Sequence, residues 1–324
     1  MALRRLATDD PESDYQSFVD AEVAAVERSL FTIQPMWCSF QGVTCGNFSG
    51  LSDYGRVLEI DLSQSSLIGS LPSSIGNFGN LTFFDIATNG IYGTIPATIS
   101  GLRSLQQIII RSNTFDGSIP SSIGNCKDLE FLDLSFNSFT GSVPTSIGRL
   151  TKLSYLDLNF NSLTGSLPSS LVKLTSLIAL DLSTNYIEGT IPSLITTFTL
   201  LRGLNLYNNK FSGTIPTSIG QLKRLEQLGL HLNLLTGTIP LGFSNMKLLS
   251  DLDLHYNYLT MGSALRVDPS TFSNTTTAGL LDISQNCLVY ISKSFPLRNT
   301  NASHCLPPTR KYEYEYEYVA SRSA

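Results

Sequence analysis

Apolar and polar residues alternate in short runs along this chain, and the runs recur every 24 residues. In the unit 129–152, Leu132 and Leu134 flank Asp133, and this period of two is typical of a strand with one buried face. A period of 24 is too long for the repeat of a single helix or strand. Each interval therefore predicts one complete coil of backbone, stacked on the coil before it.

Three further columns of residues keep the same step. The asparagine column consists of Asn89, Asn113, Asn137, Asn161, Asn185, Asn209, Asn233 and Asn257. A buried amide at this bend is expected to bond the main-chain groups that neighbouring coils leave unpaired, which is a structural role. The glycine column, Gly69 to Gly237, permits a tight turn, and the proline column, Pro72 to Pro240, falls where no regular ladder is expected.

Stacked coils place their strands side by side, ~4.8 Å apart, in one parallel sheet on the concave side. We expect a solenoid over residues 57–286, an unstructured start over 1–13, an N-terminal cap over 14–56, a C-terminal cap over 287–310 and a disordered tail over 311–324. The N-terminal cap contains apolar residues at helical spacing between Asp14 and Leu30. A longer convex loop, Met261 to Ala278, and a tenth strand, Leu280 to Ile283, are expected to close the stack.

The cysteines fall at the two caps, apart from Cys126. Cys38 with Cys45 and Cys287 with Cys305 form two close pairs, which predicts cap disulfides and an oxidising compartment. Zinc is the competing interpretation, but these spacings lack the close Cys pairs of structural zinc sites. Cys126 occupies a position that is leucine in other coils, so we expect a small buried core residue there.

Four glycosylation sequons, at Asn47, Asn80, Asn274 and Asn301, also favour an extracellular or cell-surface location. The first ten residues contain no apolar stretch of seven or more, so no signal peptide is visible in them, and nothing in the chain reaches membrane-spanning length. Charged residues make up 15% of the chain and the formal net charge is −5, without a basic stripe. This composition argues against nucleic acid or an anionic membrane as a partner.

The candidate binding surface is the concave side of the strands. Its aromatic residues are Phe83, Phe131, Phe136, Tyr155 and Phe160. The last four fall in the fourth and fifth coils on a face that should be wet, which suggests a hot spot for a partner chain or a sugar ring. Stacking of these rings on one another to support the sheet is an equally good interpretation.

Two other groups of residues on this face have side chains that could bind a metal ion or take part in catalysis. Tyr207, His231 and His255 follow one another in successive coils, and two imidazoles ~5 Å apart could share a metal ion or sense mild acid. No carboxylate completes a ligand set in their column, so we favour ordinary polar contacts and expect no metal. Asp133 and Asp157 have the spacing of a glycosidase pair, but an open sheet offers no pocket that would raise a pKa. We therefore expect neither catalysis nor a cofactor.

The unit L-x-x-L-x-L-x-x-N-x-L-x-G-x-I-P-x-x-I-G-x-L-x-x resembles the plant-specific class of leucine-rich repeat, and C-S-F-Q-G-V-T-C resembles its N-terminal cap. The resemblance implies an α/β solenoid, a right-handed superhelix of about ten coils with disulfide-bearing caps. It also implies extracellular, non-catalytic recognition of a protein, peptide or glycan, as in receptor-like ectodomains. The alternatives are a secreted inhibitor of cell-wall-degrading enzymes such as polygalacturonases, and a structural surface protein. The sequence does not indicate an oligomeric state.

Overall fold

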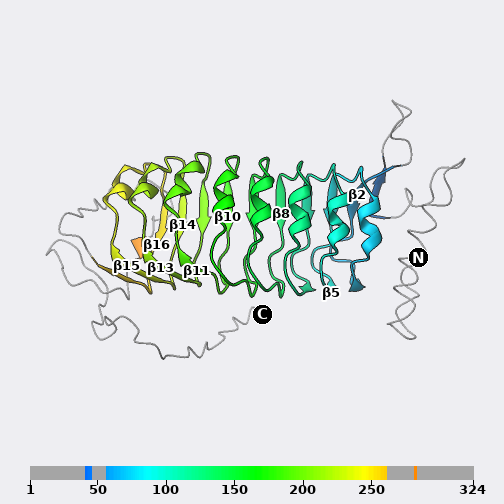
Figure 1. The fold of residues 1–324 in the computed structure, drawn as a ribbon, viewed down its shortest axis with the longest axis horizontal. Coiled ribbons are helices and arrows are strands. Elements are labelled where there is room, and N and C mark those ends of the chain that lie inside the picture. Colours follow the sequence, from blue (N-terminus) through cyan, green and yellow to red (C-terminus); the bar gives the residue numbers. More distant parts are fainter. Residues whose placement is uncertain (1–40, 46–55, 261–280, 283–324) are drawn as a thin grey trace, which may run out of the picture.

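The repeat folds into an elongated stack of coils (Figure 1). The computed structural model describes residues 41–45, 56–260 and 281–282. Within each coil the chain passes through a short strand, a bend that contains the repeat asparagine, and a short helix. Because the coils repeat the same path, residues 24 apart lie opposite each other in the strand segments that precede the asparagine, as Phe131 lies opposite Tyr155.

Within the described residues the main sheet has eleven strands, and the predicted parallel sheet is thus present. In spatial order its strands are β1 (Val43–Cys45), β2 (Val57–Asp61), β4 (Phe83–Asp85), β6 (Gln107–Ile109), β8 (Phe131–Asp133), β9 (Tyr155–Asp157), β10 (Ala179–Asp181), β12 (Gly203–Asn205), β14 (Gln227–Gly229), β16 (Asp251–Asp253) and β18 (Leu281–Asp282). β1 pairs antiparallel with β2, and the other pairs are parallel. The predicted tenth strand is observed as β18, where Leu281 lies opposite Leu252 after a longer step.

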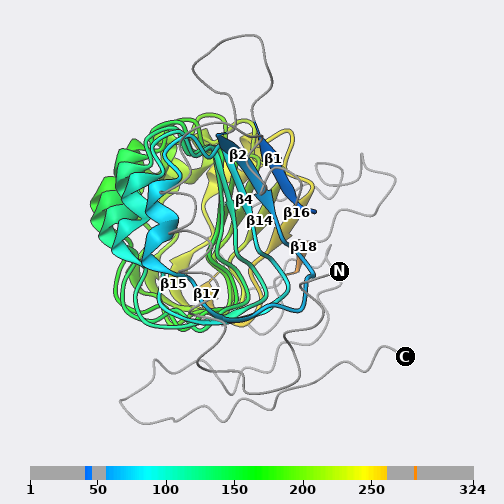
Figure 2. The ribbon, with the colours of Figure 1, turned by 90° about the vertical axis from the view of Figure 1, so that its right-hand side faces the viewer.

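The side of the stack opposite the main sheet consists of short 3-10 helices (Figure 2). They are η2 (Ser73–Asn77), η3 (Ala97–Gly101), η4 (Ser121–Asn125), η5 (Thr145–Arg149), η6 (Ser169–Lys173), η7 (Ser193–Thr197), η8 (Thr217–Gln221) and η9 (Leu241–Asn245). Each follows a repeat proline in extended conformation, as Pro144 does at φ −68° and ψ 139°. Proline fixes this φ in advance and has no N–H to satisfy, so it fits the residue that precedes the helix.

A second set of strands lies between the bend and the helix, where the sequence predicted no ladder. It forms a three-stranded sheet of β3 (Ile68–Ser70), β5 (Gly90–Gly93) and β7 (Thr114–Phe115), and a four-stranded sheet of β11 (Glu188–Thr190), β13 (Lys210–Thr214), β15 (Leu234–Thr238) and β17 (Tyr258–Thr260). The ladder ends before the proline, at Thr190 in front of Pro192. Proline therefore marks the end of this ladder but does not prevent it. Proline itself lacks the N–H needed for pairing, whereas the residues before it can pair.

Apolar side chains from all three sides fill the interior in one continuous core. Leu132 and Leu134 of the strand segment are fully buried, and so is Leu150 after the helix. Phe115 and Phe139 stack inside the core with ring centroids 6.0 Å apart. Cys126 is also fully buried, which confirms that it is a core residue, and burial raises the pKa of its thiol to about 11.

The repeat asparagines join consecutive coils. The amide nitrogen of Asn137 donates to the carbonyl oxygens of Ile110, Leu134 and Ser135 at 3.0–3.2 Å. Its Oδ1 accepts a hydrogen bond from the backbone N–H of Phe115 at 3.0 Å. One side chain thus satisfies main-chain groups of two coils at a bend where regular pairing stops.

Several predictions fall on parts of the chain that the structure does not describe. These are the helix over Asp14 to Leu30, the loop Met261 to Ala278, and the tail over 311–324. Cys45 is disulfide-bonded. Its predicted partner Cys38 lies outside the described residues, as does the pair Cys287 and Cys305, so these pairings stay predictions. Among the helices that the structure describes, none is long and apolar enough to cross a membrane.

Candidate functional site

The outward side of the main sheet, which we call the strand face, presents four columns of side chains. Six residues before the asparagine they are Glu59, Phe83, Gln107, Phe131, Tyr155, Ala179, Gly203, Gln227 and Asp251. Four before it they are Asp61, Asp85, Ile109, Asp133, Asp157, Asp181, Asn205, Gly229 and Asp253. Two before it they are Ser63, Ala87, Arg111, Ser135, Asn159, Ser183, Tyr207, His231 and His255. Directly before it they are Gln64, Thr88, Ser112, Phe136, Phe160, Thr184, Asn208, Leu232 and Tyr256.

Phe131 and Tyr155 form a ring stack on the adjacent strands β8 and β9. Their ring centroids lie 4.2 Å apart with an interplanar angle of 2°. Both side chains are half-buried, and the hydroxyl of Tyr155 donates to Asp157 Oδ2 at 3.2 Å. This stack therefore covers part of the sheet as well as presenting an aromatic edge to solvent.

Phe136 and Phe160 form a second stack, with centroids 4.4 Å apart and an interplanar angle of 10°. They are more exposed than the first pair, at 49% and 42%. Both residues have a positive φ, 52° and 49°, a conformation that costs a non-glycine residue roughly 1–2 kcal/mol. The bend that follows the strand thus forces these two rings outward.

The four rings that the sequence grouped together form two separate stacks. Phe131 and Phe136 are five residues apart on the same coil, so the stacks are separated along the strand by up to ~17 Å. Among the described residues, no ring contact joins one stack to the other. Phe83 lies two coils before Phe131, with Gln107 between them, and takes part in neither stack.

The aspartate ladder is more buried than the sequence indicated. Asp133 and Asp157 are 5% and 7% exposed. Asp133 Oδ1 accepts hydrogen bonds from the backbone N–H and hydroxyl of Ser135 at 3.0 and 2.6 Å. Each such aspartate orders the turn that leads to the asparagine, which is a structural role within the repeat.

The prediction that this sheet would leave carboxyl pKa values unperturbed is wrong for Asp157. Burial raises its pKa to about 7, and the charges of Asp181 and Asp133 add to the increase. The backbone N–H of Asn159 and the hydroxyl of Tyr155 act in the opposite direction. The sequence argument treated the sheet as open, whereas Asp157 is buried, and burial disfavours the charged form of a carboxyl group.

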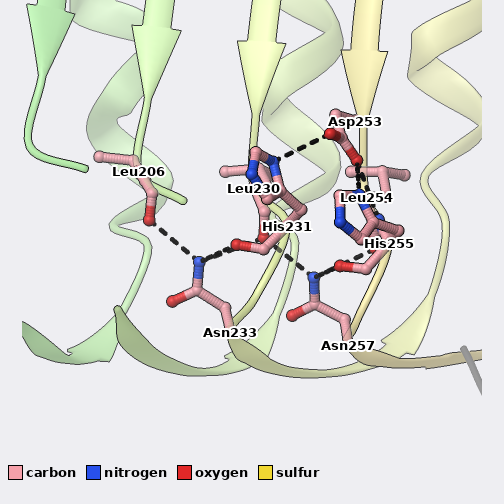
Figure 3. Close-up of polar contacts among 8 residues, drawn as sticks. All are labelled: Leu206, Leu230, His231, Asn233, Asp253, Leu254, His255 and Asn257. Atoms are coloured by element: carbon pink, nitrogen blue, oxygen red, sulfur yellow. Dashed lines mark hydrogen bonds and ion pairs between the residues drawn. The ribbon is translucent and has the colours of Figure 1, made fainter. Parts of the chain in front are cut away.

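The histidines lie together at the C-terminal end of the strand face. Tyr207, His231 and His255 form a continuous stack, with centroids 4.4 and 4.5 Å apart, and Tyr256 meets His255 edge-on at 4.9 Å. Asp253 lies against both imidazoles (Figure 3). No carboxylate lies in the column of the two histidines itself, and Asp253 reaches them from the neighbouring column of the same face.

Of the predicted glycosylation sites, Asn80 lies half-exposed in the turn before β4. Asn47, Asn274 and Asn301 lie outside the described residues. The use of all four sequons stays a prediction.

Two family models match the repeats. The model described as "Leucine rich repeat" matches residues 127–187, and a second, described as "Leucine Rich Repeat", matches 104–126 and 200–222. A search of curated proteins finds no match.

Solved structures with a similar fold include plant receptors. The Arabidopsis receptor kinase HAESA in complex with the peptide hormone IDA and the co-receptor SERK1 is 28% identical, with a TM-score of 0.62 over 85% of this chain and 53% of that chain. The plant peptide hormone receptor RGFR1 in complex with RGF2 is 34% identical, with a TM-score of 0.57 over 68% of this chain and 39% of that chain. A plant ice-binding protein is 25% identical, with a TM-score of 0.59 over 78% of this chain and 81% of that chain.

The chain spans only part of the receptors it matches, between 33% and 53% of the length of those described as the TDR receptor, RGFR1 and HAESA. It spans most of the ice-binding protein.

Proposed function

We propose that this leucine-rich-repeat protein, which resembles plant receptor ectodomains, is an extracellular recognition module that binds a peptide or protein segment across its strand face. The face is long, rigid and lined by side chains that the repeat leaves free to vary. Backbone hydrogen bonds of the sheet and the asparagine ladder hold those side chains in fixed positions, so binding costs little ordering of the protein itself.

The observation that carries this proposal is the exposed stack of Phe136 and Phe160. The two phenyl rings are 49% and 42% exposed and stack against each other. They therefore present apolar surface to water, which a binding partner would cover. Phe131 and Tyr155 add a second contact point on the same two coils. Rigid aromatic residues dominate binding energy at protein interfaces, and the receptor structures described above are peptide-hormone complexes.

The test uses the full chain expressed through a eukaryotic secretory route. A library of displayed random peptides is selected against the immobilised protein, and the affinity of the selected peptides is measured by biolayer interferometry. The F136A/F160A variant is expected to bind those peptides at least about tenfold more weakly, because hot-spot truncations cost ~1.4 kcal/mol or more.

A matched control places alanine at Ser142 and Ser166, which are exposed and lie away from the main sheet. This S142A/S166A variant is expected to retain full affinity. Selection of no peptide, or equal affinity for both double variants, would show that the strand face is not the recognition surface.

A second candidate function is ice binding, favoured by a column of hydroxyl groups along another side of the stack. In each coil the residue after the repeat glycine is serine or threonine, and all eight are exposed: Ser70, Thr94, Ser118, Ser142, Ser166, Thr190, Thr214 and Thr238. The glycine of the next coil makes room for the first seven of them. A Cβ at Gly237 would lie 2.7 Å from the Thr214 methyl carbon.

This column is a row of exposed hydroxyl groups that recurs once in each coil, beside a ladder that pairs residues 22 apart, as Thr190 pairs with Ser212. A regular, rigid row of donors and acceptors suits a surface that is itself a hydrogen-bonded lattice, as the surface of ice is. This chain matches 81% of the length of the ice-binding protein described above, which supports this candidate.

Thermal hysteresis and inhibition of ice recrystallisation test the second candidate. Tyrosine in place of Ser142, Ser166 and Thr190 is expected to abolish both effects, because bulky rings break the flat row, while F136A/F160A retains them. An absence of both effects in the wild-type protein rules out ice binding and leaves the peptide proposal untouched.

A further inference from the structure

His231 and His255 face the same carboxylate from adjacent coils. Asp253 ends strand β16, and its Oδ2 lies 3.0 Å from Nδ1 of His231. Its Oδ1 makes a short contact with Nδ1 of His255 (Figure 3). All three side chains are about one-fifth to one-quarter exposed, so the group is partly shielded but reachable from solvent.

The convergence arises from two departures from the repeat. In three other coils the hydroxyl of a serine two residues later donates to the strand-end aspartate, as Ser135 donates to Asp133, but here His255 occupies that position. The preceding coil has Gly229 where an aspartate is usual, so His231 has no carboxylate of its own and lies against Asp253 of the next coil.

The ring of His231 is fixed in place. The imidazole is stacked between Tyr207 and His255 with interplanar angles of 8° and 10°. Its Nδ1 is inaccessible to solvent and lies 3.0 Å from Asp253 Oδ2, so this nitrogen faces the carboxylate.

We propose that His231, Asp253 and His255 bind a divalent transition metal ion of the zinc type. Two imidazole nitrogens and one carboxylate oxygen form a donor set suited to zinc, copper or nickel. The ligating atoms of the three residues lie within 4.8 Å of one another. Zinc bonds are ~2.0–2.2 Å long and tetrahedral, so two donors on one ion lie ~3.3–3.6 Å apart, and the most distant donors of the group must move closer by about 1 Å.

The movement needed is a rotation of one imidazole. A nitrogen lone pair lies in the ring plane, and the two rings are nearly parallel with centroids 4.5 Å apart, so they do not both aim at one point as they stand. Rotation about the terminal side-chain torsion, which is broad for histidine, turns one lone pair towards the ion.

Charge near the group favours a cation. Asp251 lies two residues before Asp253 on strand β16. Two carboxylates beside two imidazoles give the site a net negative charge whenever the histidines are neutral. Three protein donors leave a zinc ion with one open position, which on this face would point to solvent or to a bound partner.

The experiment is titration of the full chain with zinc chloride after removal of metal by a chelator, followed by isothermal calorimetry and thermal unfolding. One ion is expected to bind and to raise the unfolding temperature, since binding to the folded state alone stabilises it. H231Q and H255Q are each expected to weaken zinc binding by about tenfold or more, because glutamine keeps the size of the side chain but removes a strong metal donor.

The third histidine of the chain, His304, supplies the matched control. H304Q is expected to bind zinc like the wild-type protein, and magnesium is expected to produce no shift in any variant, because it prefers oxygen donors. Circular dichroism checks that each variant is folded. Absence of zinc binding below the millimolar range, or equal loss in H304Q, overturns the proposed site and does not affect the peptide proposal.

Discussion

The amide nitrogen of Asn161 donates to the carbonyl oxygen of Leu134 at 3.0 Å, across 27 residues of sequence. The same side chain donates to the carbonyl oxygens of Leu158 and Asn159, and it accepts from the backbone N–H of Phe139 at 2.9 Å. It is 8% exposed, so water does not replace these bonds when they are lost.

Alanine at Asn161 is therefore expected to lower the free energy of unfolding by ~3 kcal/mol or more, because several buried main-chain groups lose their partner at ~1–3 kcal/mol each. Urea denaturation measures the change. Asn125 is exposed and makes only a long contact, 3.4 Å, with Arg149, so N125A is the control and should cost under about 1 kcal/mol. Equal losses in the two variants would contradict the structural role of the ladder.

Glycine is required at some positions of the repeat and not at others. Gly237 has φ +77°, and an added Cβ would meet the Thr214 methyl carbon at 2.7 Å, whereas an added Cβ at Gly203 would meet nothing within 4 Å. G237A is expected to destabilise by roughly 1–3 kcal/mol. G203A should be neutral or stabilise by ~0.4–1 kcal/mol, because alanine restricts the unfolded chain. Unfolding temperatures of the two variants test this, and a larger loss in G203A would contradict it.

The raised pKa of Asp157 makes stability depend on pH. Its folded pKa is about 7 against an ordinary value of 3.8, so between these values the folded state holds a proton that the unfolded state has lost. The stabilisation is complete below about pH 4 and is lost as the pH rises through 7. The groups that act on this carboxyl are Tyr155 and the charges of Asp133 and Asp181.

D157N is expected to remove this component, because the amide is neutral at every pH and keeps an oxygen for the N–H of Asn159. Relative to D157N, the wild-type protein should lose at least about 1 kcal/mol of stability between pH 5 and pH 8, since one pKa unit corresponds to ~1.4 kcal/mol. Urea denaturation at several pH values measures the difference. Parallel curves for the two proteins would show that Asp157 has an ordinary pKa.

Phe136 and Phe139 are three residues apart, and truncation of the two side chains should lower stability by very different amounts. Phe139 is fully buried, so F139A is expected to cost ~3–5 kcal/mol. Phe136 is 49% exposed, and F136A loses mainly the stack on Phe160, worth about 1 kcal/mol. A large loss in F136A would mean that the exposed stack supports the sheet instead of remaining available for a ligand.

Cys126 is expected to be unreactive in the folded protein. Its sulfur donates to the carbonyl oxygen of Ile99 at 3.3 Å, and burial raises the thiol pKa to about 11, so little thiolate forms near neutral pH. Iodoacetamide at pH 8 should modify the Cys126 peptide only after unfolding in urea, as measured by mass spectrometry. Modification at the same rate in both states would contradict its burial.

The sequence by itself determined the coil. The period of 24 residues, the alternation around Asp133 and the asparagine column are all imposed by local geometry, since each coil must bury one apolar face and satisfy the main chain at its bend. The same pattern, read by position, also identified which side chains lie on the strand face. These features depend on residues that are close in sequence or 24 residues apart, and both spacings can be seen in one sequence.

Only the tertiary structure decided how those side chains meet. Burial of Asp157 raises its pKa, and Asp253 approaches His231 from the next coil, across two columns of the strand face. The second ladder beside the prolines also appeared only in the structure. Contacts of this kind depend on side-chain direction, stack tilt and the exclusion of water, which are properties of several coils together and of no single repeat.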